Sequence, residues 1–290
     1  MANLKEIRLR ITSVNSTMQI TSAMKMVSAA KLKRAQDAIT RMRPYATKLQ
    51  EILSNVSSTL DGNDGTYSAQ REVKNVLVVA ITSNRGLCGG FNNNVIKQVS
   101  NSIKREFTGA NVKVVSFGKK AFDAYRKTEH HYDQGFGETP YAIFDALTFN
   151  NVSALAEELM AQFASGKWDK VVLVYNRFRN AAVQQVMNEQ FLPVQPVEGA
   201  SNSKVDYIYE PTKEQILEDL IPRSLKVQLY KALLDSNAGE QGARMTAMHK
   251  ATDNAGELVK ELKLTYNKAR QAAITGEILE IVAGAESLKG

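Results

Sequence analysis

The sequence predicts an α/β domain with a largely parallel sheet, placed between two long coiled-coil helices at the ends of the chain. Three observations predict this class. One heptad pattern runs without a stutter through the first sixty residues, short apolar runs of strand length follow, and a second heptad pattern fills the end of the chain. We therefore divide the chain into an N-terminal coiled-coil helix (1–60), a central α/β domain (61–210) and a C-terminal coiled-coil helix (211–290).

The N-terminal pattern steps alternately by three and four residues over 4–60. All of its positions are apolar except three consecutive ones, Thr21, Lys25 and Ser28. A sustained 3.5-residue period predicts a left-handed supercoil with a partner helix. Pro44 is expected to kink the helix locally, because its ring removes a backbone donor and clashes with the preceding turn.

The polar interruption of this pattern has two interpretations. Ile20, Met24 and Val27 carry apolar character on a neighbouring stripe at the same height of the helix. Either the seam between the paired helices rotates locally onto this stripe, or a second partner touches the helix here. The sequence leaves both interpretations open.

The central stretch changes from helical to strand period. Continuous apolar runs predict strands covered on both faces, and helical patterns fill the gaps between them, so the sheet is expected to be largely parallel. The predicted strands are 75–82, 112–117, 170–175 and, more weakly, 184–192, and the predicted helices are 93–107, 119–127 and 152–165. Asp61–Gly65 is predicted to be a turn-rich linker into this domain.

The C-terminal stretch begins with a capping box at Thr212–Gln215. Pro222 is expected to break or kink the helix that follows. A thin seam of mostly Ala and Gly predicts that a partner backbone approaches closely; it comprises Met248, Ala251, Ala255, Leu258, Leu262, Thr265, Ala269, Ala272, Gly276, Leu279 and Ala283. A second apolar stripe near the end (Ile274, Ile278, Ile281, Ala285 and Leu288) predicts burial on more than one side.

No set of acid, base and nucleophile emerges from the sequence, so we expect a protein that is not an enzyme and holds no cofactor. The turn Thr82–Asn92 lies between a strand and a helix, as phosphate-binding turns do, but its glycines fit neither nucleotide fingerprint. A tight structural turn that presents Arg85 is favoured, with Cys88 as a buried small side chain. The three histidines lack the spacing of metal ligands, so no metal is expected.

The excess of positive charge lies on one part of the molecule, the N-terminal helix. The chain has 37 basic and 30 acidic residues, and its whole excess of +7 equals the balance of residues 1–60. A basic helix could bind nucleic acid, but no zinc module, basic zipper or stacking aromatic pattern accompanies it. The residues leave two functions open as alternatives: a nucleotide-binding α/β enzyme with helical arms and a basic coiled-coil adaptor for nucleic acid.

The compartment is also constrained. The single cysteine is typical of a reducing environment. No apolar run approaches the roughly 18 residues that a membrane-spanning helix needs, and the N-terminus does not resemble a secretory signal. A cytoplasmic protein that can sit on a membrane-bound assembly is expected.

Four segments, in order along the whole chain, resemble the gamma subunit of F-type ATP synthase: Ile20–Leu32, Arg85–Asn92, Ala243–Ala255 and Leu264–Ala285. Asn84 departs from the Asp that the family usually has before Arg85. The resemblance implies an antiparallel coiled coil of the two terminal helices inside a ring of three alpha and three beta subunits. It also implies a Rossmann-like foot domain that stands with the epsilon subunit on the c-ring, at the cytoplasmic face of the cell membrane, without inserting into it and without binding nucleic acid.

The same resemblance implies a non-catalytic rotor, because nucleotide chemistry belongs to the beta subunits of that family. Contacts between shaft and beta subunits are implied for Lys25, Met26, Arg244, Arg270, Gln271 and Thr275. A bearing at the top of the ring is implied for Ile274, Ile278, Ile281 and Leu288.

Overall fold

The structure is a computed structural model that describes residues 4–57, 66–137, 140–194 and 213–287. The predicted linker 61–65, the first residue of the capping box, Thr212, and Leu288 of the predicted bearing lie outside these ranges.

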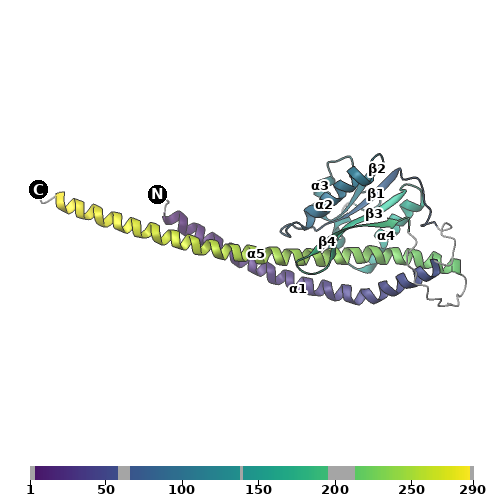
Figure 1. The fold of residues 1–290 in the computed structure, drawn as a ribbon, viewed down its shortest axis with the longest axis horizontal. Helices are drawn as coiled ribbons and strands as arrows, with labels where there is room; N and C mark the ends of the chain where they lie inside the picture. The colour runs from purple at the N-terminus through teal and green to yellow at the C-terminus, as the bar shows by residue number, and fades with distance from the viewer. Residues whose placement is uncertain (1–3, 58–65, 138–139, 195–212, 288–290) are drawn as a thin grey trace. The chain divides into compact units, whose positions relative to one another are not determined.

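Two helices account for the ends of the chain. Helix α1 runs from Leu4 to Ser57 and contains Pro44, and helix α5 runs from Lys213 to Ser287 and contains Pro222 (Figure 1). Of the two effects expected at Pro222, the break is wrong, since α5 continues through this residue, and the kink stays a prediction. Residues on both sides of this proline pack into the sheet core, Ile221 partly and Leu225 fully, and this packing offsets the one backbone hydrogen bond that the ring removes.

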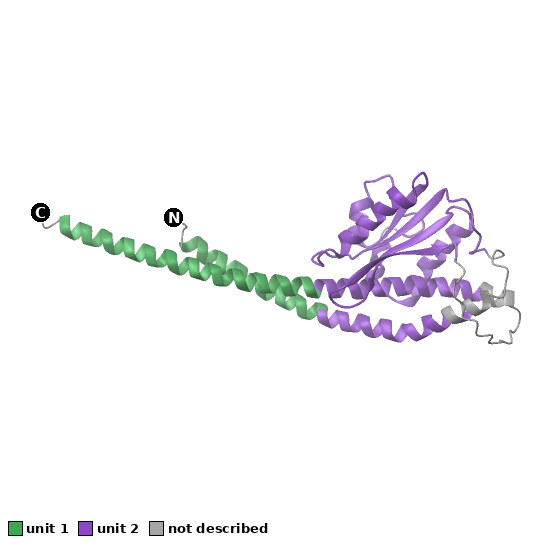
Figure 2. Cartoon of the chain, viewed as in Figure 1, with its two compact units in different colours: residues 1–28, 245–290 green, residues 29–244 purple. Residues whose placement is uncertain are grey.

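The chain divides into two compact units, residues 1–28 with 245–290 and residues 29–244 (Figure 2). This division cuts through both long helices. The division into 1–60, 61–210 and 211–290 follows the helix ends instead and stays a prediction. Each unit is described by itself.

In the first unit, α1 and α5 pair in opposite directions. Arg8 Nη2 donates to the hydroxyl of Tyr266 at 2.6 Å, the hydroxyl oxygens of Thr21 and Thr252 lie 2.8 Å apart, and Lys25 Nζ lies 3.4 Å from a ring nitrogen of His249. Residue numbers rise along one helix as they fall along the other. The pair is therefore antiparallel.

The seam of this pair does not rotate at its polar interruption. Thr21 and Ser28 are only 9% and 3% exposed, whereas Ile20 and Val27 on the neighbouring stripe are 60% and 57% exposed. The interpretation as a local rotation is therefore wrong. Small polar side chains fit because each Thr21 and Thr252 hydroxyl has two partners within reach, the other hydroxyl and a backbone oxygen of its own helix, so that neither hydroxyl is left unpaired.

On α5 the seam follows the other heptad phase. Thr265 and Ala272, predicted in the seam, are exposed, whereas Tyr266 and Ala273 are half-buried and Val259 is buried. Both phases share Met248, Ala255, Leu262, Ala269 and Gly276. The Arg8 guanidinium lies over the Tyr266 ring, 5.6 Å from its centre, and this contact fits the observed phase.

The second unit contains a four-stranded sheet of order β2-β1-β3-β4. Strand β1 pairs parallel with β2 and β3, and β4 pairs antiparallel with β3, which confirms a largely parallel sheet. The strands are β1 (Asn75–Ile81), β2 (Asn111–Phe117), β3 (Lys170–Phe178) and β4 (Gln184–Leu192).

Helices cover both faces of the sheet. They are α2 (Phe91–Asn101) with a π-helical turn at Ser102–Glu106, α3 (Lys119–Tyr125), a short 3₁₀ helix (Pro140–Phe144) and α4 (Phe149–Ala164). Val78 and its alternate neighbours in β1 face α2 and α3, while Leu77 and Val79 face α4 and the part of α5 around Leu229. Burial on both faces explains why the strands read as continuous apolar runs.

Candidate functional site

The predicted contact residues fall into two groups. Lys25 and Met26 on α1, with Arg270, Gln271 and Thr275 on α5, belong to the first unit, whereas Arg244 belongs to the second. The predicted contact residues are therefore divided between the two units.

Met26 belongs to an exposed apolar patch on α1. The patch consists of Ile20, Ala23, Met26 and Val27, all exposed, with Met26 65% exposed. Helical geometry places these residues on the side of α1 that faces away from the seam with α5. Exposed apolar side chains gathered on one side of a helix mark an interaction surface.

The Lys25 side chain points toward α5, unlike that of its neighbour Met26. It occupies a seam position, where Nζ lies 3.4 Å from Nδ1 of His249. That ring nitrogen also lies 3.3 Å from a carboxylate oxygen of Asp253 one turn further along α5. Lys25 therefore interacts across the helix pair, and only Met26 of the two is displayed outward.

The end of α5 is exposed on all sides. Every residue from 277 to 287 is exposed, as are Arg270, Gln271 and Thr275. Large apolar side chains are nevertheless frequent here: Ile274, Ile278, Leu279, Ile281 and Val282 are all exposed. We call these five residues the C-terminal apolar segment. Leu279, predicted in the seam, belongs to it, and so does Val282, which is part of neither predicted stripe. An apolar helix surface of this kind is typical of a segment that a partner surrounds.

Arg244 is the exception among the predicted contact residues, because its side chain is only 8% exposed. Nη1 pairs with Glu240 Oε1 at 2.7 Å, and Nη2 donates to the backbone oxygens of Arg85 (3.3 Å) and Gly86 (3.2 Å). Arg244 thus reaches inward, to the turn after β1.

That turn is held by buried side chains. The Ser83 hydroxyl donates to the backbone oxygen of Arg85 at 2.6 Å, and Asn92 Nδ2 donates to Cys88 Sγ at 3.2 Å. Cys88 is buried, and burial raises the pKa of its thiol. The predicted structural turn that presents Arg85 fits this arrangement, since the Arg85 side chain is exposed.

Asn84 uses both ends of its amide in the same region. Nδ2 donates to the backbone oxygen of Tyr141, and Oδ1 accepts from the backbone N–H of Lys119, each at 3.0 Å. An aspartate would keep the acceptor but lose the donor, so this departure from the usual family residue adds one hydrogen bond.

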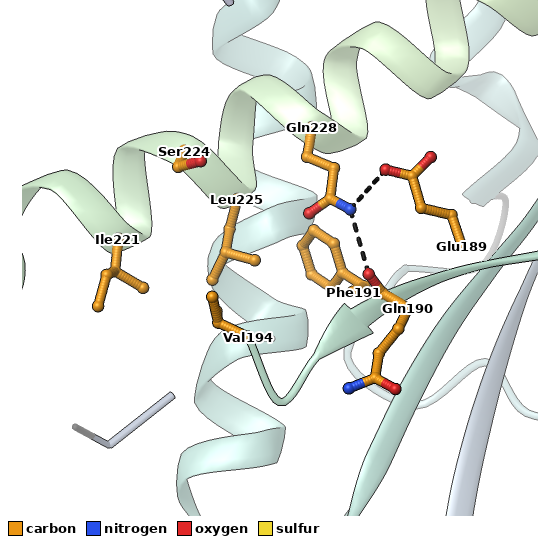
Figure 3. A pocket seen from close by; sticks show the side chains of 8 residues that line it. All are labelled: Glu189, Gln190, Phe191, Val194, Ile221, Ser224, Leu225 and Gln228. Carbon is orange, nitrogen blue, oxygen red and sulfur yellow. Dashed lines mark hydrogen bonds between the residues drawn. The ribbon is translucent and has the colours of Figure 1, made fainter. Parts of the chain in front are cut away.

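A cavity of about 260 Å³ lies beside the antiparallel strand (Figure 3). Its one carboxylate, Glu189, accepts from Gln228 at 2.7 Å and from the Tyr175 hydroxyl at 2.6 Å, so it is already engaged. The cavity is lined by Glu189, Gln190, Phe191, Val194, Ile221, Ser224, Leu225 and Gln228. This set contains no combination of acid, base and nucleophile.

The described residues contain no group of three or more His, Cys, Asp or Glu side chains that could hold a metal ion. None of the described helices combines the length and the apolar character needed to cross a bilayer.

Similarity to known proteins extends over the whole chain. A family model described as ATP synthase matches residues 3–288. The ATP synthase gamma chain of Flavobacterium johnsoniae is 63% identical over all of both chains, and that of Cytophaga hutchinsonii is 50% identical over 99% of both.

Solved structures show the same fold. A chain of the Tetrahymena thermophila mitochondrial ATP synthase central stalk and c-ring aligns with a TM-score of 0.57 at 26% identity, covering 80% of this chain and 99% of that one. A chain of the Euglena gracilis mitochondrial ATP synthase rotor aligns with a TM-score of 0.65 at 22% identity, covering 93% of this chain and 98% of that one.

Proposed function

This chain belongs to the family of ATP synthase gamma chains, and on that premise we propose that it is the central rotor shaft of an F-type ATP synthase. It couples proton-driven rotation of the c-ring to conformational change and ATP synthesis in the catalytic beta subunits. The chain itself is a non-catalytic subunit.

The observation that carries this proposal is the exposed apolar end of α5, residues 277–287, next to an antiparallel helix pair. A helix pair is stiff, because each helix satisfies its own backbone and the interlocked seam resists bending. Apolar side chains that the chain itself leaves exposed need a surrounding protein. A ring of three alpha and three beta subunits supplies such a surrounding.

The residues in contact with that ring follow from their exposure. We assign the α1 apolar patch around Met26 and the α5 residues Arg270, Gln271 and Thr275 to contacts with the beta subunits. Ile274, Ile278 and Ile281 form the bearing at the end of α5; Leu288, predicted to belong to it, lies outside the described residues. Lys25 acts from within the helix pair, and Arg244 acts through the turn that it holds.

The second unit, which contains the sheet, is assigned to the foot of the shaft, where it stands with the epsilon subunit on the c-ring. The shaft is then a peripheral part of the complex at the cytoplasmic face of the membrane. Support comes from the solved relative described as central stalk and c-ring, to which this chain is 26% identical.

The basic stretch of α1 fits an acidic protein partner better than nucleic acid. Its exposed basic residues in the second unit include Lys31, Lys33, Arg34, Arg41 and Arg43. Within the described part of the chain, only Lys33 of these forms a salt bridge with an acidic residue of its own helix, Asp37 at 2.9 Å. We propose that this surface faces an acidic segment of the beta subunits.

A tagged copy of the chain, recovered from detergent-solubilised membranes, tests the proposal. We expect an ATPase-active alpha–beta assembly to be recovered with it, together with epsilon and the c-ring. ATP turnover by the purified chain alone would favour the enzyme alternative, and salt-sensitive retention of DNA or RNA would favour the adaptor. Either result without an alpha–beta assembly would overturn the rotor assignment.

A further inference from the structure

One segment of α5 is enclosed on every side. All five residues from 238 to 242 are buried, although a surface helix normally exposes one face. A side chain at Gly239 would meet the Phe91 ring at 3.2 Å, and one at Gly242 would meet the backbone of Ala181 at 3.1 Å. The α5 backbone therefore lies directly against the start of α2 and the loop between β3 and β4.

Arg244 continues this enclosed segment with directional bonds. Its guanidinium pairs with Glu240 one turn earlier and donates to two carbonyl oxygens of the turn after β1, those of Arg85 and Gly86. The Arg85 carbonyl also accepts from the Ser83 hydroxyl. The turn is thus held by a side chain of its own segment, Ser83, and by Arg244 of α5.

The electrostatics favour an intact pair. Burial raises the pKa of the Glu240 carboxyl, and the charges of Arg244, Lys31 and Arg85 act in the opposite direction. A buried ion pair that loses one partner leaves the other charge uncompensated. The planar fork of Arg244 serves acceptors in three places, which the single ammonium of a lysine cannot reproduce.

Resting on the proposed rotor function, we propose that residues 238–244 of α5 and the turn 82–92 form the joint through which torque passes between the sheet and α5, with Arg244 as its positioning residue. The turn continues directly from β1, an interior strand of the sheet. Apolar packing is non-directional and permits a helix to slip about its axis. Close backbone contact at two glycines, together with directional hydrogen bonds, resists that slip.

The first test uses the purified full chain and its only thiol. Cys88 lies buried under the turn, so its rate of alkylation by a maleimide reports how firmly the turn is closed. We expect Arg244→Ala to raise this rate at least about tenfold under native conditions, because local opening becomes easier. Arg244→Lys should raise it less. Arg179→Ala, which removes an exposed arginine bonded to Gln185, should leave it unchanged.

Melting temperatures of the same variants separate a released turn from a poorly folded chain. If Arg244→Ala fails to fold, Arg244→Lys takes its place in the labelling comparison. An unchanged labelling rate in a folded Arg244 variant would overturn the joint.

The second test measures proton pumping per ATP hydrolysed in the assembled complex. We expect a several-fold fall with Arg244→Ala, a smaller fall with Arg244→Lys and no change with Arg179→Ala. A wild-type chain that supports no coupled pumping would refute the rotor assignment itself. Normal coupling in assembled Arg244→Ala complexes, with wild-type coupling intact, would refute the joint alone, even if Cys88 labelling were faster.

Discussion

The hydroxyl oxygens of Thr21 and Thr252 lie 2.8 Å apart in the buried seam between α1 and α5. Each hydroxyl also lies within hydrogen-bonding distance of a backbone oxygen of its own helix, that of Met18 for Thr21 and that of Met248 for Thr252. Because a hydroxyl has one proton, one threonine donates across the seam while the other donates to its own helix. A polar pair in a seam specifies which positions lie opposite each other, at some cost in stability. Because each side can be satisfied locally, the pair is a mark of register and contributes little to adhesion.

Replacing one or both threonines by valine tests this role. We expect Thr21→Val or Thr252→Val alone to lower the free energy of unfolding by about 1 kcal/mol, because the hydrogen bond between the helices is lost and the remaining hydroxyl, bonded only to its own helix, lies against a buried methyl group. The double variant should return to within about 0.5 kcal/mol of the wild type. Urea unfolding followed by circular dichroism measures all four proteins, and a double variant that shows the sum of both losses would contradict this account.

Met26→Lys tests the outward surface of α1. Because Met26 is exposed, the substitution should leave the melting temperature of the isolated chain within about 2 °C of the wild type. In the assembled complex it places a charge within the α1 apolar patch against the surrounding ring, and we expect less proton pumping per ATP hydrolysed. Met26→Leu, which keeps the apolar character, is the matched control and should pump normally. Normal pumping by Met26→Lys would remove Met26 from the interface.

The C-terminal apolar segment gives a prediction with opposite outcomes in the free and assembled protein. Ile278→Ser and Ile281→Ser should change the stability of the isolated chain by no more than about 0.5 kcal/mol, because both side chains are exposed there. The assembled complex should dissociate at a lower temperature, since buried apolar area is lost. Glu280→Gln, on the same exposed stretch, should change neither the stability of the isolated chain nor the temperature at which the complex dissociates. Unchanged thermal stability of the serine complexes would contradict the bearing.

The sheet was predictable because its strands carry their own signal. β1 is buried along nearly its whole length, so its apolar run appears in the sequence without interruption. The seam of α5 carried no such signal. Alanine and glycine occur at both possible phases, and only contacts with α1, such as that of Arg8 with Tyr266, distinguish between them.

The predicted contact residues also differ in how far the sequence indicates the direction of their side chains. Met26 lies on the outward side of α1, as a heptad reading of its neighbours would place it. The inward direction of Arg244 could not be read from α5, where an arginine is normally solvated. It depends on the carbonyl oxygens of Arg85 and Gly86, 159 and 158 residues away in the sequence, which only the folded chain brings within reach.

A buried carboxyl in the second unit makes stability depend on pH. Burial of Asp235 on α5 raises its pKa to about 6, although the cations of Lys231, Arg177 and Arg43 act in the opposite direction and Glu189 adds to the rise. These groups come from α5, β3, α1 and β4. Asp235 thus lies where several elements meet, and it forms no salt bridge within 4 Å with another of the described residues.

Because the pKa of Asp235 is raised in the folded state, the folded chain binds the proton more tightly than the unfolded chain between about pH 4 and pH 6. This carboxyl therefore makes folding less favourable as pH rises through that window, by an amount on the order of 3 kcal/mol above it. Asp235→Asn should raise the melting temperature at pH 8 and have little effect at pH 4, where the carboxyl is protonated in the native protein. Asp123→Asn, at an exposed position of α3, is the matched control. Equal melting temperatures for Asp235→Asn and the wild type at pH 8 would show that the buried carboxyl is already compensated by its neighbours.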